Sequence, residues 1–98
     1  MTRPKPFRRI AWTERFKRDY RKLPPDLRRE VDEALRLLER DPLPGRLHFE
    51  KLGGYDDPAL YTFHVTRNHS HKVSGMLDGD TLVLLRLGTH KRIDRDPR

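Results

Sequence analysis

The sequence predicts an α+β fold in which a two-helix hairpin packs on one face of a small antiparallel β-sheet, in the order β-α-α-β-β-β. In the first half of the chain, apolar residues recur at helical spacing in two segments that are separated by Pro24-Pro25. From Leu60 onward the period changes to two, which is typical of strands. Because a chain of 98 residues has room for one hydrophobic core, we expect a single domain over residues 1–98, with flexible ends at 1–7 and 94–98.

The first half begins with a segment, Arg8–Trp12, that can form a short edge strand. Thr13 is a candidate N-cap for a helix, and the apolar residues Phe16, Tyr20 and Leu23 follow it at helical spacing. The two prolines then end this helix and begin a second one, so that the two helices form a hairpin. The apolar stripe of the second helix consists of Leu27, Val31, Ala34, Leu35 and Leu38.

The second half contains three alternating runs that predict an antiparallel meander of three strands. The runs are 60–67, 71–77 and 81–87, and the polar breaks 68–70 and 78–80 join them. Ahead of the meander, the proline- and glycine-containing segments 41–47 and 53–58 predict connectors. The five residues between these connectors are too few to classify.

The register of the meander decides which side chains share a face of the sheet. If both hairpin loops have three residues, Val73 pairs with Val65 on one side and with Leu85 on the other. One face is then apolar and forms the core surface that the two helices cover. This face comprises Tyr61, Phe63, Val65, Val73, Leu77, Val83, Leu85 and Leu87.

The opposite face is polar and basic, and nothing in the chain is left over to cover it. It comprises Thr62, His64, Thr66, Lys72, Ser74, Met76, Leu82, Leu84 and Arg86. A two-residue turn at 78–79 would instead place His71 across from Arg86, with Val73, Leu82 and Leu84 on their side of the sheet. Either register puts a basic or imidazole side chain next to Arg86.

The charge of the chain is concentrated at its start. The formal net charge is +7, and residues 1–25 carry nine lysines and arginines against two acids. This distribution favours a polyanionic partner, and a nucleic acid more than a membrane surface. The same charge also keeps a protein soluble. No apolar stretch is long enough to span a membrane. The absence of cysteine excludes disulfides and a thiolate nucleophile, and it favours a reducing cytoplasm.

The polar face has the parts for RNA cleavage without a metal ion. That reaction needs a base for the 2′-hydroxyl, an acid for the 5′-oxygen and fixed cations around the phosphorane. His64, Lys72, Arg86 and His90 supply these groups. The carboxylates do not cluster and no histidine pair has i, i+4 spacing, so we expect no metal site and no cofactor.

The order of these parts resembles the RelE/ParE superfamily of bacterial type II toxins. The resemblance covers roughly residues 8–95 and rests on RFKRDYRKLPPDLRREVDEALRLLERDP, EKLGG, LYTFHVTR and LVLLRLGTHKRID. It implies a growth-inhibiting toxin that a cognate antitoxin keeps silent. In the RelE-like branch, the toxin enters the ribosomal A site and cuts mRNA there.

The resemblance also implies roles for individual residues. The spacing from Arg86 to His90 looks like the arginine-to-histidine spacing of YafQ-like members, His64 looks like their strand histidine, and His48 like a loop histidine. Two departures stand against this. The usual tyrosine-arginine pair that opens the third strand reads His71-Lys72 here, and Ile93-Asp94 stands where an aromatic residue is common.

The leading hypothesis is therefore a ribosome-dependent mRNA endoribonuclease that needs no metal and inhibits translation. His64 or His90 would act as base or acid, Arg86 would stabilise the phosphorane, and Lys72 would hold the scissile phosphate. The side chains expected to contact RNA are His48, Lys51, Arg67, Lys91, Arg18 and Lys22.

The expected partners are mRNA, ribosomal RNA and an antitoxin, and the toxin and antitoxin are expected to form a hetero-oligomer. No membrane partner is expected. The antitoxin would dock on Leu82, Leu84 and Met76, which the predicted register leaves exposed beside basic residues. Two other readings stay open: a ParE-like protein that inhibits DNA gyrase by binding, and a degenerate toxin that only binds RNA or its antitoxin.

Overall fold

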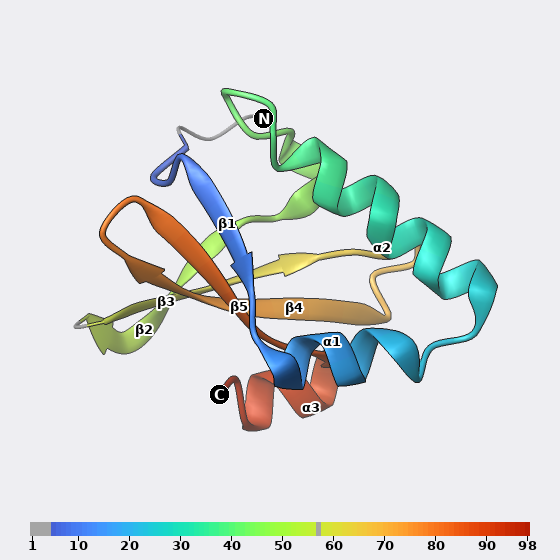
Figure 1. Ribbon diagram of the computed structural model, residues 1–98. Coiled ribbons are helices and arrows are strands. Elements are labelled where there is room, and N and C mark those ends of the chain that lie inside the picture. The colour runs from blue at the N-terminus through green and yellow to red at the C-terminus, as the bar shows by residue number, and fades with distance from the viewer. Residues whose placement is uncertain (1–4, 57) are drawn as a thin grey trace.

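The computed structural model describes residues 5–56 and 58–98 and confirms the α+β fold. Five strands form one mixed sheet in the order β1-β5-β4-β3-β2, with α2 and α3 on opposite sides of it (Figure 1). The strands are β1 (Arg9–Trp12), β2 (Glu50–Asp56), β3 (Ala59–His64), β4 (His71–Asp78) and β5 (Thr81–Thr89). The helices are α1 (Glu14–Arg21), α2 (Pro25–Leu37), the 3₁₀ turn η1 (Gly45–Leu47) and α3 (His90–Arg95). Within the described residues, no helix is long and apolar enough to cross a membrane.

The helical hairpin forms as the sequence predicts. The Thr13 hydroxyl accepts a hydrogen bond from the Phe16 amide and caps α1, and Pro25 is the first residue of α2. Phe16 is fully buried, as are the central residues of the α2 stripe, Val31 and Ala34. These side chains pack on the sheet face that carries Phe63, Val65, Val73, Leu82, Leu84 and Leu87.

The sheet is larger than the predicted antiparallel meander. Its β1 edge strand runs parallel to β5. A further strand, β2, includes most of the segment 53–58 that was expected to be a connector, and its register against β3 shifts between Lys51 and Asp56. The two glycines of this segment interrupt the apolar pattern, so the periodicity of the sequence does not predict this strand.

Neither predicted register is correct. Val73 lies opposite Phe63 and Leu87, so it does not pair with Val65 and Leu85. The β4–β5 turn has two residues, Gly79 and Asp80, and Gly79 has a positive φ of 61° that this tight turn requires. His71 lies opposite Thr89, and Arg86 lies opposite Ser74.

The two-residue turn and a bulge in β5 together account for the difference between β4 and β5. Gly75 pairs with Leu84 and Ser74 pairs with Arg86, which leaves Leu85 as the extra residue. A Cβ at Gly75 would lie only 2.8 Å from the Leu82 side chain, so the glycine makes room for Leu82 in the core. Leu82 and Leu84 are consequently buried, and the prediction that they are exposed for an antitoxin was wrong.

The second face of the sheet is covered as well, by α3 and the residues after it. Ile93 is buried there, Ser74 donates a hydrogen bond to the carbonyl of Pro97, and Lys72 is almost completely enclosed. The expectation of an uncovered polar face was therefore wrong, and Pro97, within the end expected to be flexible, is buried. At the other end of the chain, Phe7 is buried beside Phe49.

Candidate functional site

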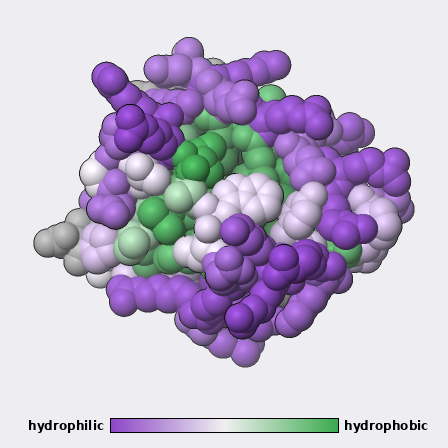
Figure 2. All heavy atoms as spheres, in the orientation of Figure 1, coloured by the Kyte–Doolittle hydropathy of each residue, from purple (hydrophilic) through white to green (hydrophobic). Residues whose placement is uncertain are grey.

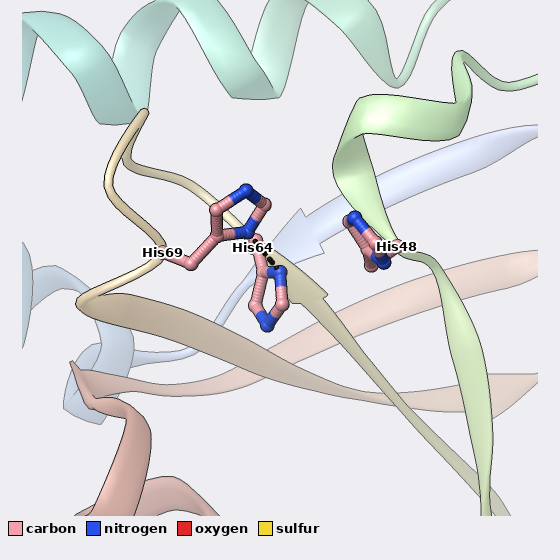
Figure 3. A group of neighbouring side chains, drawn as sticks. All are labelled: His48, His64 and His69. Carbon is pink, nitrogen blue, oxygen red and sulfur yellow. Dashed lines mark hydrogen bonds between the residues drawn. The ribbon is translucent and has the colours of Figure 1, made fainter.

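Four histidines gather at the end of the sheet where β3 ends and α3 begins, and we call them the histidine cluster: His48, His64, His69 and His90. His64 is at its centre. The ring centroid of His64 lies 4.5 Å from that of His69, 5.0 Å from that of His48 and 5.5 Å from that of His90. Figure 3 shows three of these rings facing one another from separate segments of the chain.

Two members of the cluster sit in loops with unusual backbone conformations. His48 follows η1 with φ 48°, and His69 lies in the β3–β4 loop with φ 59°. Residues with a side chain seldom adopt this left-handed region, although histidine tolerates it better than bulky residues do. Such backbone geometry is concentrated at functional sites, and here it occurs at two histidines that approach the same strand residue.

His64 is held in its neutral form. Burial lowers its pKa from the usual 6.5 to about 4, and the charges of His69, Lys72, His48 and His90 act in the same direction. The Nδ1 atoms of His64 and His69 are 2.6 Å apart, so one imidazole donates a hydrogen bond to the other (Figure 3). When His64 Nδ1 is the donor in this hydrogen bond, the neutral ring has an unprotonated Nε2, and in that tautomer His64 fits the role of a general base.

Asp94 links Lys72 and His90 in the site. One carboxylate oxygen accepts a hydrogen bond from Lys72 Nζ at 2.8 Å, and the other lies 2.8 Å from Nδ1 of His90. Burial raises the pKa of Asp94, but the hydrogen bond from Lys72 and the nearby positive charges outweigh this and lower the pKa overall. A charged Asp94 fixes the orientation of the His90 ring through Nδ1, as a carboxylate does for a histidine that takes part in proton transfer.

A shallow cavity of about 190 Å³ opens beside His64 and His69, and two arginines line it. Arg46 and Arg67 lie 3.6 and 3.7 Å from the carboxylate of Glu33, with half or more of each side chain exposed. Exposed ion pairs of this kind are weak. Both guanidinium groups are therefore available to a phosphate in the cavity.

The two cations expected to contact the scissile phosphate are engaged elsewhere. Arg86 is only 13% exposed and forms hydrogen bonds to the Asp19 carboxylate of α1 at 2.9 and 3.4 Å. The Lys72 side chain is 6% exposed and paired with Asp94. The uncovered sheet face on which their assignment depended does not exist. Both cations are thus paired within this protein, since Arg86 links β5 to α1 through Asp19 and Lys72 contacts Asp94.

The remaining predicted RNA contacts are distributed over the surface. Arg67 lines the cavity, and Lys51 is exposed on β2. Lys91 is exposed on α3, whereas Arg18 and Lys22 are exposed on and after α1. These positions are compatible with contacts to an extended polyanion but do not belong to the histidine cluster.

Sequence reasoning missed three participants: His69, Arg46 and Asp94. His69 joins His64 only because the hairpin loop turns through a left-handed residue, which no sequence period reveals. Asp94 was detectable, since it follows His90 at i, i+4 and Thr89 caps the short helix between them. His71 does not belong to the histidine cluster. Its Nδ1 atom is hydrogen-bonded to Ser70 Oγ at 2.7 Å, and burial lowers the pKa of its ring.

The sequence matches no protein-family model and no curated protein. The structure is similar to a chain of the archaeal RelE–RelB complex from Pyrococcus horikoshii, with a TM-score of 0.66, 22% identity and coverage of 94% of this chain and 99% of that chain. It is similar to YafQ from E. coli with a TM-score of 0.68 and 19% identity, covering 88% of this chain and 97% of that chain.

A third similar structure is a chain of the RelB–RelE antitoxin–toxin complex from Methanococcus jannaschii. The TM-score is 0.66 with 20% identity, over 87% of this chain and 95% of that chain. The similarities extend over nearly the whole length of each compared chain, so they concern the complete arrangement of helices and strands. The resemblance seen in the sequence is thus confirmed at the level of the fold: this chain has the same fold as these RelE–RelB and YafQ structures.

Proposed function

We propose that this chain is the toxin of a type II toxin–antitoxin system and that it cleaves mRNA on the ribosome without a metal ion. The observation that carries the proposal is the pairing of a neutral His64 with an Asp94-oriented His90 in one cluster. The similarity in fold to a structure described as an antitoxin–toxin complex supports the toxin role. A cytoplasmic location is part of this proposal, because the proposed substrate is ribosome-bound mRNA.

The cluster supports an in-line attack by the 2′-hydroxyl of RNA. His64 accepts the proton of this hydroxyl while its oxygen bonds to phosphorus, and His90 gives a proton to the departing 5′-oxygen. The products are a 2′,3′-cyclic phosphate and a 5′-hydroxyl end. The two ring centroids are 5.5 Å apart, which lets the imidazoles reach the attacking and leaving oxygens of one phosphate.

Arg46 and Arg67 are the cations placed to hold this phosphate. They line the cavity beside His64, and their shared partner Glu33 is exposed. A guanidinium group can contact a phosphate with two parallel hydrogen bonds, which suits the negative charge that develops on the phosphorane. In this proposal they replace the pair that the sequence indicated, Arg86 and Lys72.

The antitoxin would dock in a hollow between β1 and α2 instead of on the buried leucines of β5. Ile10, Trp12 and Leu35 line this hollow with a rim of charged residues, and Trp12 is 40% exposed. Figure 2 shows apolar atoms at its base, surrounded by hydrophilic side chains. Because β1 is an edge strand, a partner segment could also add to the sheet there.

A ParE-like inhibitor of DNA gyrase is the second candidate, and one observation favours it. Lys72 and Arg86 are both committed to carboxylates within this protein. A protein that acts by binding needs neither cation at a phosphate. In poisoned cells, gyrase-trapped DNA breaks with intact mRNA would support this candidate.

The test is primer extension on a defined mRNA in a reconstituted translation reaction that includes wild type, His64→Ala, His90→Ala and, as matched control, His71→Ala. We expect cuts at the A-site codon that require ribosomes. Loss of the base or the acid should slow cleavage by about 10²–10⁴-fold, and the control should cleave normally. Intact mRNA under conditions where the protein still stops growth would contradict the proposal.

A further inference from the structure

We propose that His48, His64 and His69 form a binding site for Zn²⁺, and that an ion bound there inhibits the RNA cleavage proposed above. One ring nitrogen from each of the three histidines lies within 4.8 Å of the other two. The three residues come from the segment after η1, the end of β3 and the β3–β4 loop (Figure 3). The second half of this inference rests on the proposed function, whereas the first half does not.

The donor set selects the kind of ion. Three imidazoles without a carboxylate suit Zn²⁺ and its neighbours Cu²⁺ and Ni²⁺, whereas Mg²⁺ and Ca²⁺ prefer oxygen ligands. Three protein ligands leave a fourth tetrahedral position open to water. His48 and His69 are exposed, so an ion can enter from solvent without any opening of the fold.

The geometry requires adjustments in both directions, because ring nitrogens that lie within 4.8 Å of one another must also move together around one ion. The Nδ1 atoms of His64 and His69 are 2.6 Å apart, whereas two nitrogens on a tetrahedral zinc ion, each about 2.0–2.1 Å from the metal, lie about 3.4 Å from each other. The ion therefore replaces the hydrogen bond between the two rings. His69 is exposed in a loop, and rotation of its side chain provides the extra separation.

Metal binding and cleavage compete for the same atoms. When one nitrogen of His64 coordinates zinc, the neutral ring carries its proton on the other nitrogen, so neither has a lone pair for the 2′-hydroxyl proton and the zinc-bound protein lacks its base. The ion would also add positive charge beside His90 and occupy the side of the cavity that His64 and His69 line. The site is therefore inhibitory in a reaction that itself needs no metal.

The binding half is tested by isothermal titration calorimetry of the full chain, without a polyhistidine tag, with ZnCl₂. Wild type should bind one ion per chain. His48→Ala and His69→Ala should each weaken binding by at least the roughly 10–100-fold that loss of an outer-shell partner costs. Both replaced side chains are exposed, so these variants should fold. His71→Ala serves as the matched histidine control and should bind as wild type does.

Two results would overturn the site: no saturable binding by wild type, or unchanged affinity in both His48→Ala and His69→Ala. The inhibitory half is tested by adding ZnCl₂ to the cleavage reaction after preparation of the protein in EDTA. Cleavage that persists at saturating zinc would overturn inhibition. Zinc binding by a protein that cleaves no mRNA would uphold the site and defeat the proposed function, so the two failures are distinguishable.

Discussion

Asp94 organises the charges of the candidate site at the scale of single residues. Its two carboxylate oxygens contact Lys72 and His90, and both partners lie close enough to His64 to lower the pKa of that ring. One carboxylate thus keeps a buried ammonium paired and also directs the histidine that faces the proposed leaving group. Asp94 acts through these neighbours and is a positioning residue.

Replacement of Asp94 by Asn tests this positioning role. The amide keeps the size of the side chain but loses the carboxylate charge that fixes the His90 ring, so we expect slower cleavage, by about 10-fold or more, of an mRNA whose leaving group needs an acid. A purely structural role predicts an equal rate loss on an mRNA in which sulfur replaces the scissile 5′-oxygen, because that leaving group needs no acid, and single-turnover rates on the two substrates separate the outcomes.

The low pKa of His64 predicts a loss of stability in acid. Above pH 6.5 the ring is neutral in both the folded and the unfolded chain, but between about pH 6.5 and pH 4 only the unfolded chain binds the proton. The free energy of unfolding should therefore fall as the pH falls through this interval. The groups that oppose a charge on His64 are Lys72 and the other three members of the histidine cluster.

Urea unfolding in EDTA at several pH values measures this effect. His64→Gln removes the titrating ring, so its free energy of unfolding should depend less on pH than that of wild type between pH 6.5 and pH 4. Parallel curves for the two proteins would show that His64 titrates normally in the folded state. EDTA keeps metal ions from contributing to the comparison.

At the scale of elements, the join between α1 and β5 explains why Arg86 is not free. β1 pairs with β5 only as far as Leu84, so the edge of β5 beyond this residue has no strand partner. Asp19 fills the gap, because its carboxylate accepts hydrogen bonds from the Leu87 amide and from Arg86. A side chain of α1 thus provides the hydrogen-bond partner for a backbone amide next to the bulge.

This arrangement predicts that Arg86→Ala affects stability. The substitution leaves the largely buried Asp19 carboxylate without its cation and should lower the free energy of unfolding by about 1.5–3 kcal/mol. In a double-mutant cycle with Asp19→Asn, the second substitution should cost less once the first is present. An Arg86→Ala protein that unfolds like wild type but cleaves no RNA would instead return Arg86 to the active site.

At the scale of the whole molecule, local signals predicted the elements, and long-range packing decided the site. The capping threonine, the two prolines and the two periodicities identify both helices and three strands. Those signals could not predict on which face of the sheet each β5 side chain lies, because the bulge at Leu85 reverses the alternation that the sequence shows. Gly75 inside a strand was the one local hint of it.

The histidine cluster likewise depends on tertiary structure. Its members come from four segments, and the fold brings them to one end of the sheet. Sequence reasoning selected His48, His64 and His90 but assigned the phosphate contacts to cations that the fold pairs internally. The difference arises from α3, which turns the expected open face into an interior that contains Lys72.

The measurement that tests the central claim most directly is cleavage of ribosome-bound mRNA in which sulfur replaces the 5′-bridging oxygen at the scissile phosphate. A thiolate leaves without protonation, so this substrate needs a base but no acid. If His64 is the base and His90 the acid, His90→Ala should cleave the sulfur-containing mRNA at a rate close to that of wild type, while His64→Ala should stay inactive. Equal impairment of His90→Ala on both substrates would contradict the assignment, and the absence of any cleavage by wild type would contradict the account as a whole.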